Sequence, residues 1–221
     1  MTDQPKRLSS GERREALLKA AREIFIKHGY VDTSLEMIID RAGGSRRSIY
    51  KEFGGKEGLF HAIVDENAAQ ITAGLKAFNK DEDFDVREEL RNFSSGYLRV
   101  LFGPNGIGVF RIVQMECLRF PKLVRRFFES GPEMALKWLT DLFEIAAVKG
   151  YVNVADPRLA ADHFMSMIRG QMHLRLLLGL TKAPAKRELD EFITSAVGTF
   201  LNGIAGINTS TLAIDRNQGR G

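Results

Sequence analysis

The sequence is poor in cysteine and has no long apolar run. Its 221 residues include one cysteine, Cys117, so no disulfide forms within the chain, which suits a reducing compartment. No apolar stretch approaches the roughly 20 residues that cross a bilayer, and the richest, LRLLLGL at 174–180, contains Arg175. The first residues lack the apolar segment of a secretory signal. We therefore expect a cytoplasmic protein with no membrane partner.

The sequence also lacks the residue patterns of common catalytic sites. Its four histidines form no closely spaced pair of the HExxH kind, and a single cysteine excludes CxxC zinc sites. The GPNGIG stretch at 103–108 follows a helical pattern and lacks the Lys-Ser/Thr of a phosphate loop, so we interpret it as a helix connector. We expect no metal, no cofactor and no enzyme activity, with an all-α enzyme as a distant alternative.

The charge of the chain is only mildly positive. The formal net charge is +4, within an ordinary globular composition of 44% hydrophobic and 27% charged residues. Most of the excess lies early, because the first 60 residues hold 12 Lys and Arg against 9 Asp and Glu. This asymmetry favours an anionic partner but is too small to establish one.

Apolar residues recur at helical spacing almost throughout, and no segment alternates like a strand. Capping boxes at Ser9 and Thr33 start the first two helices, and Gly29 and Gly43 end them. We predict helices over 10–28, 34–42, 45–52, 56–79, 86–102, 107–119, 121–129, 132–149, 156–179 and 187–203. The fold class is therefore all-α, with N-terminal residues 1–8 and a C-terminal tail at 205–221 that we expect to be mobile.

The stretch AGGSRRSIYKEF at 42–53 places a glycine turn between two short helices, the arrangement of a helix-turn-helix. In that motif the second helix presents its first residues to base edges in the major groove. Guanidinium groups and hydroxyls suit guanine or phosphate, and a phenol or ammonium one turn later suits the backbone. The candidates are Ser45, Arg46, Arg47, Ser48, Tyr50, Lys51 and Lys56. The alternative is an ordinary solvated helix start.

The order of residues in GYVDTSLEMIIDRAGGSRRSIYKEFGGKEGLF, at 29–60, resembles the N-terminal signature of TetR-family transcriptional regulators. The matching positions are Gly29, Tyr30, Thr33, Ser34, Ile38, Ala42, Gly43, Ser45, Ile49, Tyr50, Phe53, Lys56, Glu57 and Leu59. Two positions depart from it: Ile39 replaces the usual Ala, and Gly44 replaces the usual Val, which should loosen the turn. The resemblance implies DNA contacts from Thr33 and Ser34, and a DNA-binding domain at 1–55.

The segment 109–143 resembles, more loosely, the C-terminal domain of AefR-like members, which implies a ligand-binding and dimerisation domain at 56–204. In that family the C-terminal helices enclose a small-molecule cavity, and the last two helices pair with those of a second copy. We predict as cavity walls Phe110, Gln114, Cys117, Trp138, Phe143, Phe164 and Met167, although simple core filling is the alternative for each. For the interface we predict Gln171, Leu174, Leu178, Phe192, Ala196 and Phe200.

These expectations converge on a homodimeric repressor that binds a palindromic double-stranded DNA operator and is released by a small apolar effector. A constitutive dimeric DNA-binding protein without an effector is the alternative. The sequence leaves the effector and the operator unidentified.

Overall fold

The computed structural model describes residues 9–73 and 82–205, and within these ranges the chain is helical without any strand. Ten α-helices and one π-helical turn follow one another through short connections in the described residues. The predicted all-α fold class is therefore confirmed. The predicted mobile segments at 1–8 and 206–221 lie outside the described residues.

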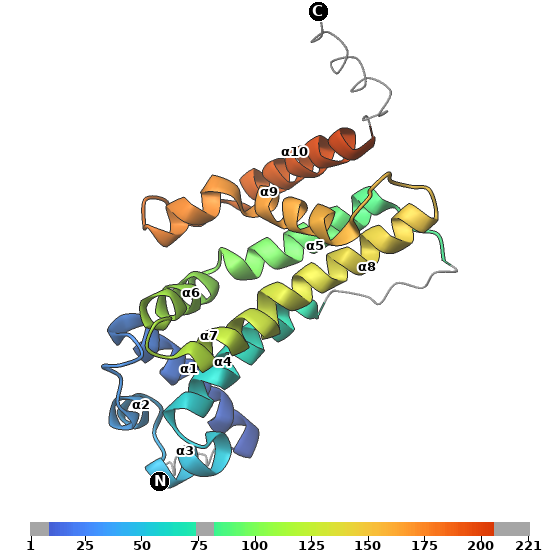
Figure 1. Ribbon diagram of the computed structural model, residues 1–221. Helices are drawn as coiled ribbons and strands as arrows, with labels where there is room; N and C mark the ends of the chain where they lie inside the picture. Colours follow the sequence, from blue (N-terminus) through green and yellow to red (C-terminus); the bar gives the residue numbers. More distant parts are fainter. Residues whose placement is uncertain (1–8, 74–81, 206–221) are drawn as a thin grey trace, which may run out of the picture.

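Four helices form the N-terminal part of the molecule. They are α1 Ser10–His28, α2 Leu35–Ala42, α3 Arg46–Phe53 and α4 Lys56–Thr72. The predicted capping box of α1 is present, because the Ser9 hydroxyl accepts the N–H of Glu12 while the Glu12 carboxylate accepts the N–H of Ser9. Helices α2 and α3 lie at one end of the molecule, and α4 leads from there toward its middle (Figure 1).

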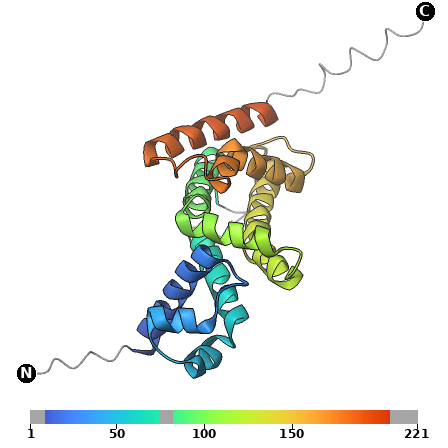
Figure 2. The same ribbon diagram turned by 90° about the vertical axis from the view of Figure 1, so that its left-hand side faces the viewer.

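The remaining helices form the larger C-terminal part. They are α5 Val86–Leu101, α6 Pro104–Glu116, α7 Pro121–Phe128, the π-helical turn η1 Glu129–Glu133, α8 Met134–Val148, α9 Pro157–Leu177 and α10 Lys186–Ala205. Helix α8 packs along α9, and α10 packs on α5 and α9. Figure 2 shows α10 across the end of the molecule that is opposite to α2 and α3.

Two proline-containing stretches that we predicted as breaks are helical. The GPNG stretch begins α6, because Gly103 is its N-cap and Pro104 occupies the first helical position, where no N–H is needed. The SGP stretch belongs to η1, which connects α7 to α8 without an interruption. A local π turn changes the hydrogen-bond ladder, so Pro132 is accommodated within the helical path.

Helix α9 is kinked where the sequence predicted a regular helix. Gly170 has φ 47° and ψ −158°, in the region that favours glycine. The helix that we predicted over 156–179 is therefore interrupted in its middle.

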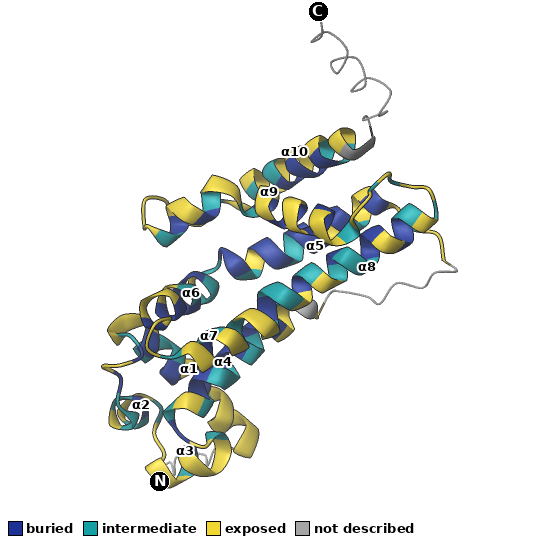
Figure 3. Cartoon of the chain, viewed as in Figure 1, coloured by how far each residue is buried: buried dark blue, intermediate teal, exposed yellow. Residues whose placement is uncertain are grey.

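Buried apolar side chains gather in two cores. Figure 3 shows that buried residues occur in both parts of the molecule. The C-terminal core unites α5, α8, α9 and α10 around rings such as Phe93 and Phe143. The N-terminal core joins α1 to α4, and it also contains Ile112 of α6 and Leu123 of α7. Packing is thus continuous between the helices on either side of residue 55, and the domain boundary there remains a prediction.

Candidate nucleic-acid interface and cavity

Two glycines and one capping serine, Ser45, form the turn between α2 and α3, and a second serine, Ser34, caps the start of α2. Gly43 and Gly44 have φ values of 75° and 106°, which favour glycine, so a valine at Gly44 would be strained. Ser34 caps α2 by accepting the N–H of Met37 at 3.3 Å. Ser45 caps α3 by accepting the N–H of Ser48 at 3.2 Å, and the two hydroxyls lie 2.9 Å apart. The caps fix where α3 begins and therefore which side chains lie at its tip.

Three predicted DNA-contacting side chains on α3 point into solvent. Arg47, Tyr50 and Lys51 are exposed, with 59% of Tyr50 accessible. Neither Arg47 nor Lys51 forms an ion pair with any residue that the structure describes. Their charges are therefore available to an external anion.

Arg47 and Lys51 also line a groove between the start of α1 and α3, with a volume of about 270 Å³. Arg13 and Arg14 line the same groove from α1. Glu52, the one carboxylate among its described lining residues, lies 3.5 Å from Arg14. The sequence prediction missed the two α1 arginines, although the run GERRE was a visible signal. Such a basic groove suits a sugar-phosphate backbone.

Arg46 differs from its neighbour Arg47 because it is paired within the protein. Its Nε donates to the carboxylate of Glu36 on α2, and both side chains remain exposed. The hydrogen bond from Arg46 lowers the pKa of Glu36, and the same bond raises the pKa of Arg46. One of the five N–H donors of the Arg46 guanidinium is therefore committed to Glu36, and the others are not.

The prediction that Thr33 contacts DNA through its side chain is wrong. Thr33 is 2% exposed, and its hydroxyl donates to the carbonyl of Gly29 at 2.6 Å. The side chain ties the end of α1 to the start of α2. Ser34, beside it, is half-buried and is the N-cap of α2, so the capping box predicted at Thr33 is wrong.

Lys56, which we predicted to contact DNA, uses its ammonium group inside the protein, and its contact with DNA remains a prediction. The Nζ atom donates to the carbonyls of Tyr30, Val31 and Thr33 at 2.9, 3.2 and 2.9 Å. It also lies 4.7 Å from the centre of the Tyr30 ring. Burial lowers the pKa of Lys56. Lys56 therefore fastens the loop before α2 onto the first turn of α4.

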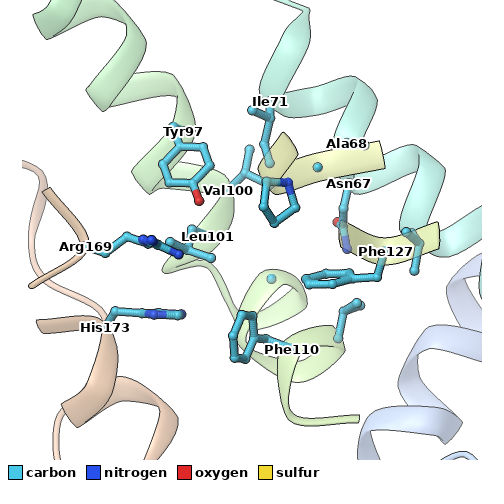
Figure 4. A pocket seen from close by; sticks show the side chains of 15 residues that line it. Asn67, Ala68, Ile71, Tyr97, Val100, Leu101, Phe110, Phe127, Arg169 and His173 are labelled. Carbon is cyan, nitrogen blue, oxygen red and sulfur yellow. The ribbon is translucent and has the colours of Figure 1, made fainter. Parts of the chain in front are cut away.

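A cavity lies farther along α4, between that helix, α5, α6, η1 and α9 (Figure 4). Its volume is about 50 Å³, and most of its lining is apolar. The polar side chains are few: Asn67 on α4, Tyr97 on α5, and Arg169 and His173 on α9. Figure 4 shows Arg169, His173 and Tyr97 on one side and Asn67 and Phe127 on the other.

The polar atoms of this cavity are poorly satisfied. Asn67 is 7% exposed, and neither its amide oxygen nor its amide nitrogen has a hydrogen-bond partner in the described residues. His173 is 8% exposed, and its Nε2 is likewise without one. Burial, with the nearby Arg169 charge, lowers the pKa of His173 to about 4, so the imidazole is neutral near pH 7.

Of the seven residues predicted to line a cavity, Phe110 alone is among the described residues that line this one. Gln114, Cys117 and Met167 are exposed, because they lie on the solvent faces of their helices. Trp138 is half-buried and stacks on Phe93 with ring centres 5.2 Å apart. These four predictions do not fit the cavity.

Two further predicted cavity residues and two predicted interface residues belong to the C-terminal core instead. Phe200 lies 5.6 Å from the ring centre of Phe143 and 5.0 Å from that of Phe164. Ala196 is buried beside them in the same core. These four side chains pack within one chain, so the predicted stripe on α10 faces inward rather than toward a second copy.

The other predicted interface residues face outward to different degrees. Leu174 and Leu178 are 55% and 64% exposed, and Gln171 is exposed on the same half of α9. Phe192 of α10 is half-buried against the C-terminal core. The exposed apolar surface in this region therefore comes from the end of α9.

Helix α6 connects the cavity with the N-terminal core. Phe110 lines the cavity, while Ile112 of the same helix packs against the N-terminal helices. At the end of α6, Glu116 is 5% exposed and its Oε2 has no partner in the described residues. Burial, then the charges of Glu57 and Glu116, raise the pKa of Tyr30 to about 12. The end of α6 thus lies close enough to Tyr30, the ring against which Lys56 packs, for the charge of Glu116 to act on it.

The described part of the chain contains neither a metal-binding cluster nor a membrane-spanning helix. No group of three or more His, Cys, Asp or Glu residues there has the arrangement of a metal site. No described helix is both long and apolar enough to span a membrane.

A capped helix-turn-helix with free cations at its tip, followed by a helical part with a cavity, defines a DNA-binding regulator. Residues 17–63 match the model of the tetR family of bacterial regulatory proteins, and residues 88–203 match the C-terminal domain of AefR-like transcriptional repressors. The chain belongs to the TetR family of DNA-binding transcriptional regulators, which confirms the resemblance noted in the sequence.

Individual relatives agree with this assignment. The regulator YvkB of Bacillus subtilis is 24% identical over 191 residues, covering 86% of this chain and 95% of YvkB. The repressor ComR of Escherichia coli is 34% identical, but only over 36% of this chain and 38% of ComR.

Two solved structures are similar over most of the chain. The flavonoid-responsive regulator FrrA is 28% identical with a TM-score of 0.70, covering 90% of this chain and all of FrrA. A TetR-family regulator of Mesorhizobium loti is 26% identical with a TM-score of 0.72 over the same shares.

Proposed function

We propose that the chain represses transcription as a dimer that places α3 of each subunit in successive major grooves of an operator. Arg47 in the first turn of α3 and Lys51 in its last turn, both exposed and without an ion pair in the described residues, carry this proposal. Arg47 is assigned to base recognition, with Tyr50, Lys51 and the serines at 34, 45 and 48 on the sugar-phosphate backbone. Arg13 and Arg14 extend the backbone contact along the groove.

The experiment compares binding to the DNA upstream of the protein's own coding region with binding to unrelated DNA. At about 0.15 M salt, specific sites are typically favoured by 10³-fold or more. We expect Arg47→Ala to lose about 1–3 kcal/mol of discrimination at one base pair. Lys51→Ala should weaken all sequences alike and reduce the salt slope by about 1.

Lys137→Ala is the charge-matched control, because Lys137 pairs with Asp141 on α8, far from α3. Equal loss on all sequences for Arg47→Ala would make Arg47 a backbone contact. Arg46→Ala tests the same assignment for the paired arginine: a loss of base discrimination there would mean that Arg46 also contacts a base.

The dimer that we propose uses the exposed end of α9 rather than the inner face of α10. Leu174 and Leu178 supply apolar surface that is unusual for a solvent-facing helix end. Changing both to Lys should give monomers of unchanged helicity in sedimentation experiments. Phe200→Lys should instead unfold the chain, because Phe200 is buried among other rings. A persistent dimer in the leucine double variant would place the interface elsewhere.

We further propose that a small aromatic molecule in the cavity governs DNA binding. Phe110 and Phe127 form aromatic walls, and similarity to a flavonoid-responsive regulator supports this class. Helix α4 carries Lys56 beside the helix-turn-helix at one end and Asn67 in the cavity at the other. A ligand that favours one position of α4 and α6 therefore biases the separation of the two α3 helices.

One observation favours the alternative of a regulator without an effector. The cavity volume of about 50 Å³ is far smaller than the roughly 300 Å³ of common ligand sites. Effector binding therefore requires side chains such as Phe127 to move. Thermal stabilisation of the full chain by small aromatic compounds distinguishes the two hypotheses, since a solid core would show none.

A further inference from the structure

We propose that the ligand of the cavity is an aromatic carboxylate, held through its anionic group by Arg169 and through a hydrogen-bonding group at its far end by Asn67. This inference rests on the effector role proposed above for the same cavity, and it specifies the chemical class of the molecule.

The first observation is a cation without a counter-ion. Arg169 is half-buried, and its Nε donates to the carbonyl of Met165 in its own helix at 3.2 Å. It forms no ion pair with any acid in the described chain, and no carboxylate is among the described residues that line the cavity. A partly buried charge is favourable only when it is paired, so the terminal guanidinium nitrogens are suited to an incoming anion.

The second observation is the set of neutral donors beside Arg169. The Tyr97 side chain points toward Arg169 and His173 in Figure 4. Burial raises the pKa of Tyr97, so its phenol keeps the proton. Neutral His173 has an unpartnered Nε2, and its ring meets that of Phe110 edge to face with centres 5.0 Å apart. A guanidinium, a phenol and an imidazole together offer a carboxylate planar, charge-assisted hydrogen bonds.

The wall of the cavity opposite Arg169 carries the third feature, the unpartnered side chain of Asn67. Asn67 has both of its amide heavy atoms unpartnered and is 93% buried, since 7% of it is exposed. An amide can both donate and accept, so it suits a hydroxyl group. Phe110 and Ile71 lie between the two polar ends and Phe127 lies beside Asn67, and these apolar groups suit the flat faces of an aromatic ring. The ligand is thus polar at both ends and aromatic between them.

The experiment measures binding of matched probes to the full-length protein by calorimetry. The probes are 4-hydroxybenzoate and 4-hydroxycinnamate, each compared with its primary amide, which keeps the shape but removes the charge. We expect each acid to bind at least about tenfold more tightly than its amide, because hydrogen bonds between charged groups are the stronger ones. Acetate, the anion without the ring, should not bind measurably.

Arg169→Gln should abolish the preference for the acid while leaving amide binding nearly unchanged. Arg99→Gln is the matched control, because Arg99 is exposed on α5 and bonds to Ser95, outside the cavity. If Arg169→Gln does not fold, Arg169→Lys serves instead: it keeps the charge but loses the guanidinium fork, so the preference should shrink without vanishing.

Several results would overturn the proposal. They are amides that bind as tightly as the acids, acetate that binds as tightly as the aromatic acids, a preference for the acid that survives Arg169→Gln, and the absence of binding by every probe. Operator binding is measured on the same preparation. If DNA is bound specifically while the probes fail, the ligand class is wrong and the regulator assignment stands.

Discussion

The two ends of helix α4 differ in whether their polar groups have hydrogen-bond partners within the chain. At its start, Lys56 directs its ammonium group to three backbone carbonyls within 3.2 Å. Three turns later, Asn67 has a buried amide with neither heavy atom partnered in the described chain. Full satisfaction fixes one geometry, whereas an unsatisfied buried group costs free energy until a partner arrives. The start of α4 is therefore held in one geometry, whereas the cavity end has polar atoms that lack a partner within the described chain.

The same contrast extends to the neighbours of each end. Thr33, beside Lys56, is buried and bonded to Gly29. His173, across the cavity from Asn67, is buried with an orphan Nε2 and a depressed pKa. The cavity end therefore belongs to the same helix whose first turn Lys56 fastens to the loop before α2.

The largest loss of stability should come from removing the ammonium group of Lys56. Lys56→Met keeps the length of the side chain but leaves three carbonyls without their donor, which should destabilise the chain by about 2–3 kcal/mol. Urea unfolding followed by circular dichroism measures this loss.

Lys51→Met is the control, since Lys51 is exposed on α3. It should change stability by no more than about 0.5 kcal/mol and yet weaken DNA binding. If the Lys56 variant is instead stable and only its DNA affinity is weakened, the result would support the DNA contact that the sequence predicted for Lys56.

Much of the N-terminal part could be predicted from the sequence because its signals are local. The capping serines and the glycines of the α2–α3 turn act within three or four residues of themselves, and they define where α3 starts. Lys56 could not be placed in this way, because its Nζ donates to carbonyls 23 to 26 residues away in the sequence. Thr33 bonds to Gly29 only four residues before it, but its burial depends on the packing of the folded chain. The pairing of Arg46 with Glu36 has the same origin, because it joins two helices across the turn.

The C-terminal part was predicted less well because periodicity identifies an apolar face without saying what covers it. Phe200 and Phe164 follow helical spacing whether their partner is the same chain or a second one, and the structure places them in one core. The cavity was missed because its polar members, Asn67 and Arg169, lie on helices far apart in sequence. Neither residue stands in a motif that marks it.

The next effect is a dependence of stability on pH at the cavity end. The pKa of His173 is about 4 in the folded chain, against about 6.5 when unfolded, so the unfolded state binds the extra proton first as pH falls. Stability should therefore decrease between pH 6.5 and pH 4, by about 2 kcal/mol after allowance for solvent screening. Denaturant midpoints across this range measure the decrease.

His173→Phe should flatten that part of the profile, because the aromatic packing stays while the titrating group is lost. His163→Phe, on the exposed side of the same helix, should leave it unchanged. A profile that is equally steep in His173→Phe would assign the effect to carboxylates elsewhere and weaken the contrast between the two ends of α4.

The smallest expected change is a gain in stability, in contrast to the losses above. Asn67→Leu replaces an unpartnered amide with an apolar group of similar size, so no hydrogen bond within the chain is lost and a desolvation cost is removed. We expect the free energy of unfolding to rise by about 1 kcal/mol, while 4-hydroxybenzoate loses affinity because its hydroxyl has no partner. A loss of stability instead would mean that bound water already satisfies Asn67. The two ends of α4 would then differ in the identity of the partner, protein or solvent, and no longer in whether a partner exists.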